Sequence, residues 1–149
     1  MNVLIADDHD LFRDSMAALL REQNENIEVT LAANLGVAFY AIQSRKKFDL
    51  IILDLCMPGM DGLRGAENLI GQVGDTPVVL MSGSERTEII NKAQSIGMKG
   101  FISKTLSGPL LMNAINLIVS GETFFSRTEK MKTIGHSATS LTLPDWSTA

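Results

Sequence analysis

Five short apolar runs, separated by longer segments with a different pattern, constrain the fold of this chain more than any other feature. The runs cover residues 3–6, 29–32, 50–53, 78–81 and 101–102. The third and fourth runs are apolar at every position, as is typical of parallel strands that are covered on both faces. The segments between the runs repeat apolar residues three and four positions apart, which predicts helices. Alternating strands and helices predict an α/β fold, with five parallel strands, right-handed crossovers and helices on both faces of the sheet.

Length and composition narrow the class of protein. The chain has 149 residues, 45% of them hydrophobic, which suits one domain with a real core and at most a small appendage. Its 13 basic and 17 acidic side chains give a net charge of −4, which argues against a nucleic-acid or anionic-membrane surface. Cys56 is the single cysteine, so there is no internal disulfide. Because no run is long enough to span a membrane and no signal peptide is present, we expect a cytoplasmic protein.

The composition changes near the C-terminus. Residues 1–125 carry the alternating pattern, whereas residues 126–149 are rich in Ser and Thr and show no period. We therefore expect one domain over 1–125, followed by a linker or tail over 126–149. A helix-turn-helix does not fit into this tail, so the sequence predicts no output domain in the chain.

Polar side chains follow four of the predicted strands directly. Asp7 and Asp8 come after the first strand, Asp54 after the third, Ser82 after the fourth and Lys104 after the fifth. Ligands of such sheets bind at the carboxyl ends of the strands, so these side chains are expected to meet at one edge. Each has an ordinary explanation when taken singly, such as a helix-start acid pair or a solvated lysine. Their common position at successive strand ends favours a functional site.

The chemistry of this set points to phosphoryl transfer. Carboxylates that are held together must take up protons or a cation, and ligands that are all oxygen favour Mg²⁺. A lysine and a hydroxyl group beside the metal can stabilise the charge on phosphoryl oxygens. A carboxylate in this setting can act as the nucleophile and form an acyl phosphate.

These residues resemble the receiver domain of bacterial two-component response regulators. The resemblance rests on Asp7-Asp8, on Asp54 with the Met-Pro-Gly-Met-Asp-Gly segment at 57–62, on Ser82-Gly83 and on Lys104, and it covers about residues 1–125. It implies a flavodoxin-like (βα)5 three-layer sandwich with the strand order 2-1-3-4-5. It also implies a sensor histidine kinase as the phosphodonor and a homodimer that forms on phosphorylation.

The family's roles carry over to the matching positions. Asp54 is expected to accept the phosphoryl group, Lys104 to bind a phosphoryl oxygen, and Ser82 to hydrogen-bond the group and move toward it. Phe101 is expected to turn inward as Ser82 moves. The expected Mg²⁺ ligands are Asp8, Asp54 and the backbone carbonyl of Cys56, with Asp7 acting mostly through a water. The only chemistry expected is self-phosphorylation and autodephosphorylation, so the protein is not an enzyme with an external substrate.

The output of the switch is a further expectation. Thr105 after the lysine and the segment 121–126 resemble the LuxR-type subfamily, in which a linker leads to a DNA-binding domain. Without that domain, this chain itself is expected to bind no nucleic acid. Thr105 stands where many receivers have proline, which leaves the geometry of the Lys104–Thr105 peptide open.

Three alternatives remain at this stage. The chain could be a stand-alone receiver that signals by protein contact, or a scaffold that works without phosphorylation. A haloacid-dehalogenase-type phosphatase also uses an Asp nucleophile and Mg²⁺, but it has two Asp residues spaced two apart after the first strand. Here the acids Asp7 and Asp8 are adjacent.

Overall fold

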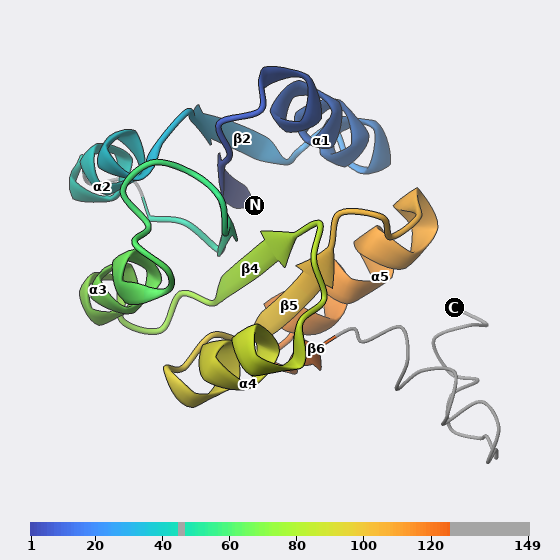
Figure 1. The fold of residues 1–149 in the computed structure, drawn as a ribbon. Coiled ribbons are helices and arrows are strands. Elements are labelled where there is room, and N and C mark those ends of the chain that lie inside the picture. The colour runs from blue at the N-terminus through green and yellow to red at the C-terminus, as the bar shows by residue number, and fades with distance from the viewer. Residues whose placement is uncertain (45–46, 126–149) are drawn as a thin grey trace, which may run out of the picture.

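The structure is a computed structural model that describes residues 1–44 and 47–125 (Figure 1). The expected linker over 126–149 lies outside the described residues. The strands are β1 (Asn2–Ala6), β2 (Glu28–Ala32), β3 (Leu50–Asp54), β4 (Val78–Ser82), β5 (Gly100–Ser103) and β6 (Phe124–Phe125). The helices are α1 (Asp10–Gln23), α2 (Leu35–Gln43), α3 (Arg64–Val73), α4 (Thr87–Ser95) and α5 (Gly108–Val119). None of these helices is both long and apolar enough to cross a membrane.

The strands form one parallel sheet in the order β2-β1-β3-β4-β5-β6. The predicted α/β fold and the order 2-1-3-4-5 are therefore confirmed, but the expectation of five strands was one too few. The additional strand, β6, places Phe124 opposite Gly100. Two residues are too short to show an alternating pattern, so this strand had no signal of its own in the sequence.

The core has two parts, one on each face of the sheet. Side chains of β1, β3 and β4 alternate between them, so that Leu4 and Ile51 face one part while Ile5 and Ile52 face the other. Helices α2, α3 and α4 cover the first face, and α1 and α5 cover the second (Figure 1). This double cover explains why the central strands are apolar at every position.

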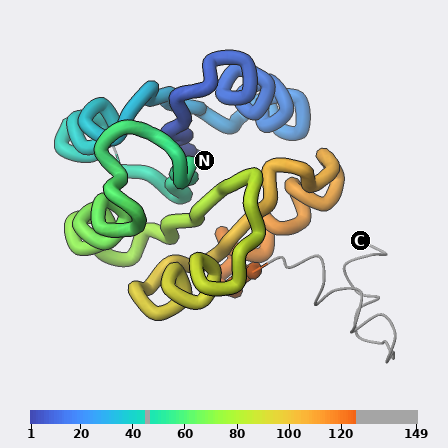
Figure 2. Tube along the Cα trace, in the orientation of Figure 1, coloured from blue at the N-terminus to red at the C-terminus, as the bar shows by residue number. Residues whose placement is uncertain are grey.

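The carboxyl ends of the strands define one edge of the molecule. The segments that follow β1, β3 and β5, shown in blue, green and orange in Figure 2, come together at this edge. The strand register places Asp54 beside Met81 and Ser82 beside Ser103, so the last residues of neighbouring strands are level. Residues far apart in the sequence are thereby brought to one place.

Candidate functional site at the carboxyl edge of the sheet

The backbone fixes four of the predicted site residues at this edge. Asp54 and Ser82 are the last residues of β3 and β4. The N–H of Asp7 donates to the carbonyl of Ala32 at 3.0 Å, and the N–H of Lys104 donates to the carbonyl of Ser82 at 2.9 Å. The side chains are therefore held by the sheet rather than by a mobile loop, which suits a preorganised site.

An ammonium group between two buried carboxylates forms the centre of the site. Lys104 Nζ lies 3.1 Å from Asp7 Oδ2 and 3.1 Å from Asp54 Oδ1. The side chains of Asp7 and Asp54 are only 2% and 3% exposed, and that of Lys104 is 16% exposed. Because water is largely excluded, these contacts are stronger than ion pairs on the surface.

The pKa values of Asp54 and Lys104 are both raised, but for different reasons. Burial is the main cause that raises the pKa of Asp54, the charge of Asp7 adds to it, and Lys104 and the backbone N–H of Cys56 act in the opposite direction. Burial on its own would lower the pKa of Lys104, but the contacts with Asp7 and Asp54 outweigh it and raise this pKa. One lysine therefore does not fully compensate the carboxylates around it.

One hydrogen-bond acceptor of the acidic cluster has no partner in the protein. Asp54 Oδ2 is buried and has no hydrogen-bond partner, which is unusual for a buried carboxylate oxygen. Asp8 lies beside it with its side chain 35% exposed, and Asp7, Asp8 and Asp54 all offer oxygens that could hold one cation. An oxygen-rich set of this kind fits a hard divalent cation.

The remaining predicted residues lie at or behind this edge. Ser82 is buried, and its Oγ accepts a hydrogen bond from the N–H of Ser84 at 3.0 Å. Phe101 is fully buried in the core on the side of α2, α3 and α4. Cys56 is exposed, and its backbone N–H is hydrogen-bonded to the carboxylate of Asp54.

The loops around the site have well-defined backbone conformations, and one of them answers the question that the sequence left open. The Lys104–Thr105 peptide is trans. The N–H of Thr105 donates to Ser103 Oγ at 3.2 Å, and the two hydroxyl groups are hydrogen-bonded at 2.8 Å. After β3, Gly59 has a φ of 96°, a conformation that strongly favours glycine. The buried side chains of Met57 and Met60 anchor the same loop on either side of Gly59.

Three residues outside the predicted set complete the site; only His9 had been considered from the sequence, as a residue that could touch its rim. His9 Nδ1 lies 3.1 Å from Asp7 Oδ1 and 3.4 Å from Asp8 Oδ1. Arg13 Nη1 donates to the backbone carbonyl of Asp7 at 2.7 Å, and Phe12 lies beneath Lys104, with Nζ 4.6 Å from the ring centre. The position of His9 directly after the acid pair was a usable signal, whereas the apolar stripe that contains Phe12 predicts only a core position.

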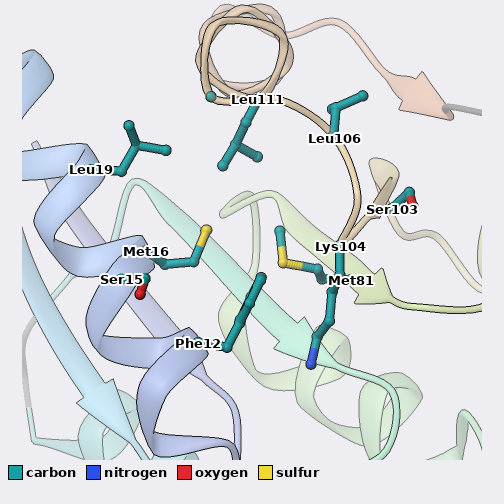
Figure 3. Close-up of a pocket in the computed structure, with 10 residues that line it drawn as sticks. Phe12, Ser15, Met16, Leu19, Met81, Ser103, Lys104, Leu106 and Leu111 are labelled. Carbon is teal, nitrogen blue, oxygen red and sulfur yellow. The ribbon is translucent and has the colours of Figure 1, made fainter.

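A small cavity lies behind the lysine, between α1 and α5 (Figure 3). Its volume is about 140 Å³, and apolar side chains, including Met16, Leu19 and Leu111, line most of it. Phe12 and Lys104 both line it, and the Nζ of Lys104 contacts Asp7 and Asp54. The aliphatic part of Lys104 therefore packs against apolar surface while its ammonium group faces the carboxylates, as is common for long basic side chains.

Taken together, the doubly covered parallel sheet and the acidic cluster with its lysine define an α/β signalling domain that could bind a metal at the carboxyl edge of the sheet. The family model of the response regulator receiver domain matches residues 3–116. The chain belongs to this family. Receiver domains of response regulators are signalling modules that typically do not act on an external substrate.

The individual relatives agree with this assignment. A glycerol metabolism activator from Pseudomonas putida is 35% identical over 122 residues, which are 82% of this chain and 55% of the relative. The oxygen regulatory protein NreC from Staphylococcus aureus is 30% identical over 125 residues, which are 83% and 57% of the two chains. The chain thus spans a little over half the length of these curated relatives.

The solved structures place the domain within a subfamily. A LuxR family DNA-binding response regulator from Silicibacter pomeroyi superposes with a TM-score of 0.76 and 32% identity, over 86% of this chain and 98% of the other. The signal receiver domain of the putative response regulator NarL from Mycobacterium tuberculosis superposes with a TM-score of 0.72 and 28% identity, over 81% of this chain and 97% of the other. These relatives of the LuxR and NarL type confirm the predicted resemblance. The described residues form the receiver domain of such a regulator and contain no DNA-binding domain.

Proposed function

We propose that the chain is a Mg²⁺-dependent phosphorylation switch, in which Asp54 accepts a phosphoryl group from a phosphohistidine on a sensor histidine kinase. The observation that carries the proposal is the state of the Asp54 carboxylate. Its Oδ1 is paired with Lys104 Nζ at 3.1 Å, and its buried Oδ2 has no hydrogen-bond partner, so one oxygen can form a bond to phosphorus while the other holds a cation. A nucleophile needs such an oxygen within a site that also stabilises the incoming charge.

The transfer step follows from these positions. An oxygen of Asp54 attacks phosphorus, the P–N bond of the phosphohistidine breaks, and its electron pair stays on the imidazole nitrogen, which takes a proton from solvent. The Lys104 ammonium group neutralises charge on the phosphoryl oxygens, and the Ser82 hydroxyl donates to one of them. Autodephosphorylation reverses the roles, since water attacks phosphorus and the Asp54 carboxylate leaves.

The residues that would hold Mg²⁺ are Asp8 and Asp54, the backbone carbonyl of Cys56 and, through a water, Asp7. All of these ligands are oxygens, which is the set that Mg²⁺ prefers. When bound, the ion supplies positive charge that offsets both the carboxylates and the transferred group. The partnerless Oδ2 of Asp54 supports this assignment, because a cation would satisfy it.

The phosphoryl group must change the local balance of charge. It adds about −1.5 to −2 charges beside Asp7, which is already buried and negative. We propose that Ser82 gives up its bond from the Ser84 N–H, moves toward the phosphoryl group and allows Phe101 to repack. A switch of this kind needs two arrangements of α4 and β5.

We further propose that the receiver domain occupies residues 1–125, with a linker over 126–149, and that it works in the cytoplasm with its kinase. Phosphorylation would favour a homodimer and regulate transcription through a DNA-binding output domain. The supporting observation is the similarity to a LuxR family DNA-binding response regulator.

Mass spectrometry tests the phosphorylation directly. The chain is incubated with Mg²⁺ and acetyl phosphate, and one added phosphoryl group is expected. Asp54→Asn abolishes the mass increase, whereas Asp75→Asn, at an exposed carboxylate outside the cluster, leaves it unchanged. A mass increase that survives Asp54→Asn, or none in the parent chain, contradicts the proposal.

A further inference from the structure

The imidazole of His9 lies among the three carboxylates of the site. Its Nδ1 is 3.1 Å from Asp7 Oδ1, 3.4 Å from Asp8 Oδ1 and 3.8 Å from Asp54 Oδ2. Ligand atoms of all four residues lie within 4.8 Å of one another. One nitrogen donor is thus added to a set that otherwise contains only oxygens.

We propose that His9 is a ligand that lets this site bind nitrogen-preferring transition-metal ions, such as Co²⁺ and Zn²⁺, in addition to Mg²⁺. Imidazole is a favoured ligand of these ions, whereas Mg²⁺ takes oxygen ligands and keeps waters. The inference deepens the proposed function and rests on it, because it concerns the same acidic pocket.

A second observation supports a cation at this position. Asp54 is almost fully buried, and its Oδ2 has no hydrogen-bond partner. The distance of 3.8 Å from His9 Nδ1 is too long for a hydrogen bond between the two. A metal ion there would serve as the missing partner of Asp54 Oδ2. It would replace the present contacts of His9 Nδ1, which lies 3.1 Å from Asp7 Oδ1 and 3.4 Å from Lys104 Nζ.

His9 can enter and leave the site without a change in the fold. Its backbone is fixed at the start of α1, since its N–H donates to Asp7 Oδ1 at 2.8 Å and its carbonyl accepts from the N–H of Arg13 at 2.9 Å. Its side chain, in contrast, is 61% exposed, so the ring has room to turn toward solvent. The carboxylates can therefore bind Mg²⁺ with the ring turned away, and bind a transition-metal ion with the ring turned in.

This arrangement predicts that the effect of His9 depends on the class of metal. Loss of the imidazole removes one ligand from a Co²⁺ or Zn²⁺ site but none from the Mg²⁺ site. Loss of a carboxylate weakens both, because both ions use the same oxygens. The two kinds of variant therefore separate the role of the nitrogen from that of the acidic cluster.

Calorimetric titration of the metal-free 149-residue chain with CoCl₂ and with MgCl₂, in the absence of any phosphodonor, tests the inference. For His9→Ala we expect the dissociation constant of Co²⁺ to rise about tenfold or more, because substitution of residues that support a metal site typically weakens metal binding by at least this factor. The dissociation constant of Mg²⁺ should stay unchanged. The visible absorption of bound Co²⁺ should change at the same time. Asp8→Asn should weaken both ions, and His136→Ala, at the other histidine of the chain, should weaken neither.

Three results would overturn the inference. These are equal Co²⁺ binding and equal spectra for His9→Ala and the parent chain, an equal loss of Co²⁺ and Mg²⁺ affinity in His9→Ala, or loss of Co²⁺ binding in His136→Ala. If the proposed function is wrong, mass spectrometry detects no phosphoryl group on Asp54, and the metal titrations are unaffected. The two failures can therefore be distinguished.

Discussion

Replacing Lys104 with Met should destabilise the metal-free domain strongly. The substitution keeps the aliphatic stem, which packs against Phe12 and the cavity behind it, and removes only the charge. Asp7 and Asp54 then remain buried without the cation that each contacts at 3.1 Å. Removal of one partner from a buried ion pair is costly because the other charge stays behind.

The magnitude follows from the two contacts. At 3.1 Å and an effective dielectric constant of about 20, each contact has a Coulomb energy of about −5 kcal/mol. Protonation of one carboxylate and entry of water limit the loss, so we expect the free energy of unfolding to fall by about 3 kcal/mol at pH 7. For a domain of this size, that corresponds to a decrease in Tm of about 10 °C.

Urea and thermal unfolding of the parent chain and Lys104→Met, in buffer with a chelator, measure this difference. Lys99→Met is the matched control, because Lys99 is exposed and its loss should change little. Asp54→Asn combined with Lys104→Met should recover part of the lost stability, since one uncompensated charge is removed. The reasoning is refuted if Lys104→Met is as stable as the parent chain, or if Asp54→Asn adds a further loss to it.

Three further predictions concern the acid, the packing and the last strand. Because burial raises the pKa of Asp54 above 3.8, its charge destabilises the fold once it ionises, so Asp54→Asn should be more stable than the metal-free parent chain. The gain in the free energy of unfolding of Asp54→Asn is absent below pH 3.8 and grows as the pH rises through the raised pKa. Denaturant titrations of both chains from pH 3.5 to 8 measure this gain, and a difference that does not change with pH would contradict the reasoning. Gly65→Ala should cost about 1–3 kcal/mol, because its Cβ would lie 2.8 Å from the backbone carbonyl oxygen of Gly59. Gly71→Ala on the same helix has open space and should gain about 0.5–1 kcal/mol. Equal chemical-denaturation midpoints for the two variants would contradict this reasoning. Phe124→Ala should cost about 3 kcal/mol if β6 is part of the domain, and a negligible change in Tm would show that the domain ends before it.

Much of the fold was predictable because its signals are local. Strands covered on both faces must be apolar at every position, so Leu53 and Leu80 lie in runs that can be recognised without knowledge of their neighbours. The site was predictable for a related reason, since parallel strands end at one edge and the polar residue after each strand must lie there. Asp7, Asp54 and Lys104 are indeed within contact distance.

The sequence by itself therefore determined the class of fold and the edge that carries the candidate site, and it predicted the type of chemistry proposed there. Only the tertiary structure decided which groups touch. The 3.1 Å contacts of Lys104, the imidazole of His9 above the carboxylates and the open Oδ2 of Asp54 depend on where α1 and β5 lie relative to β3. The pairing of β6 with β5 was likewise invisible in a two-residue segment. Periodicity reports which face of an element is buried, whereas distances between elements arise from packing, to which residues far apart in the chain contribute together.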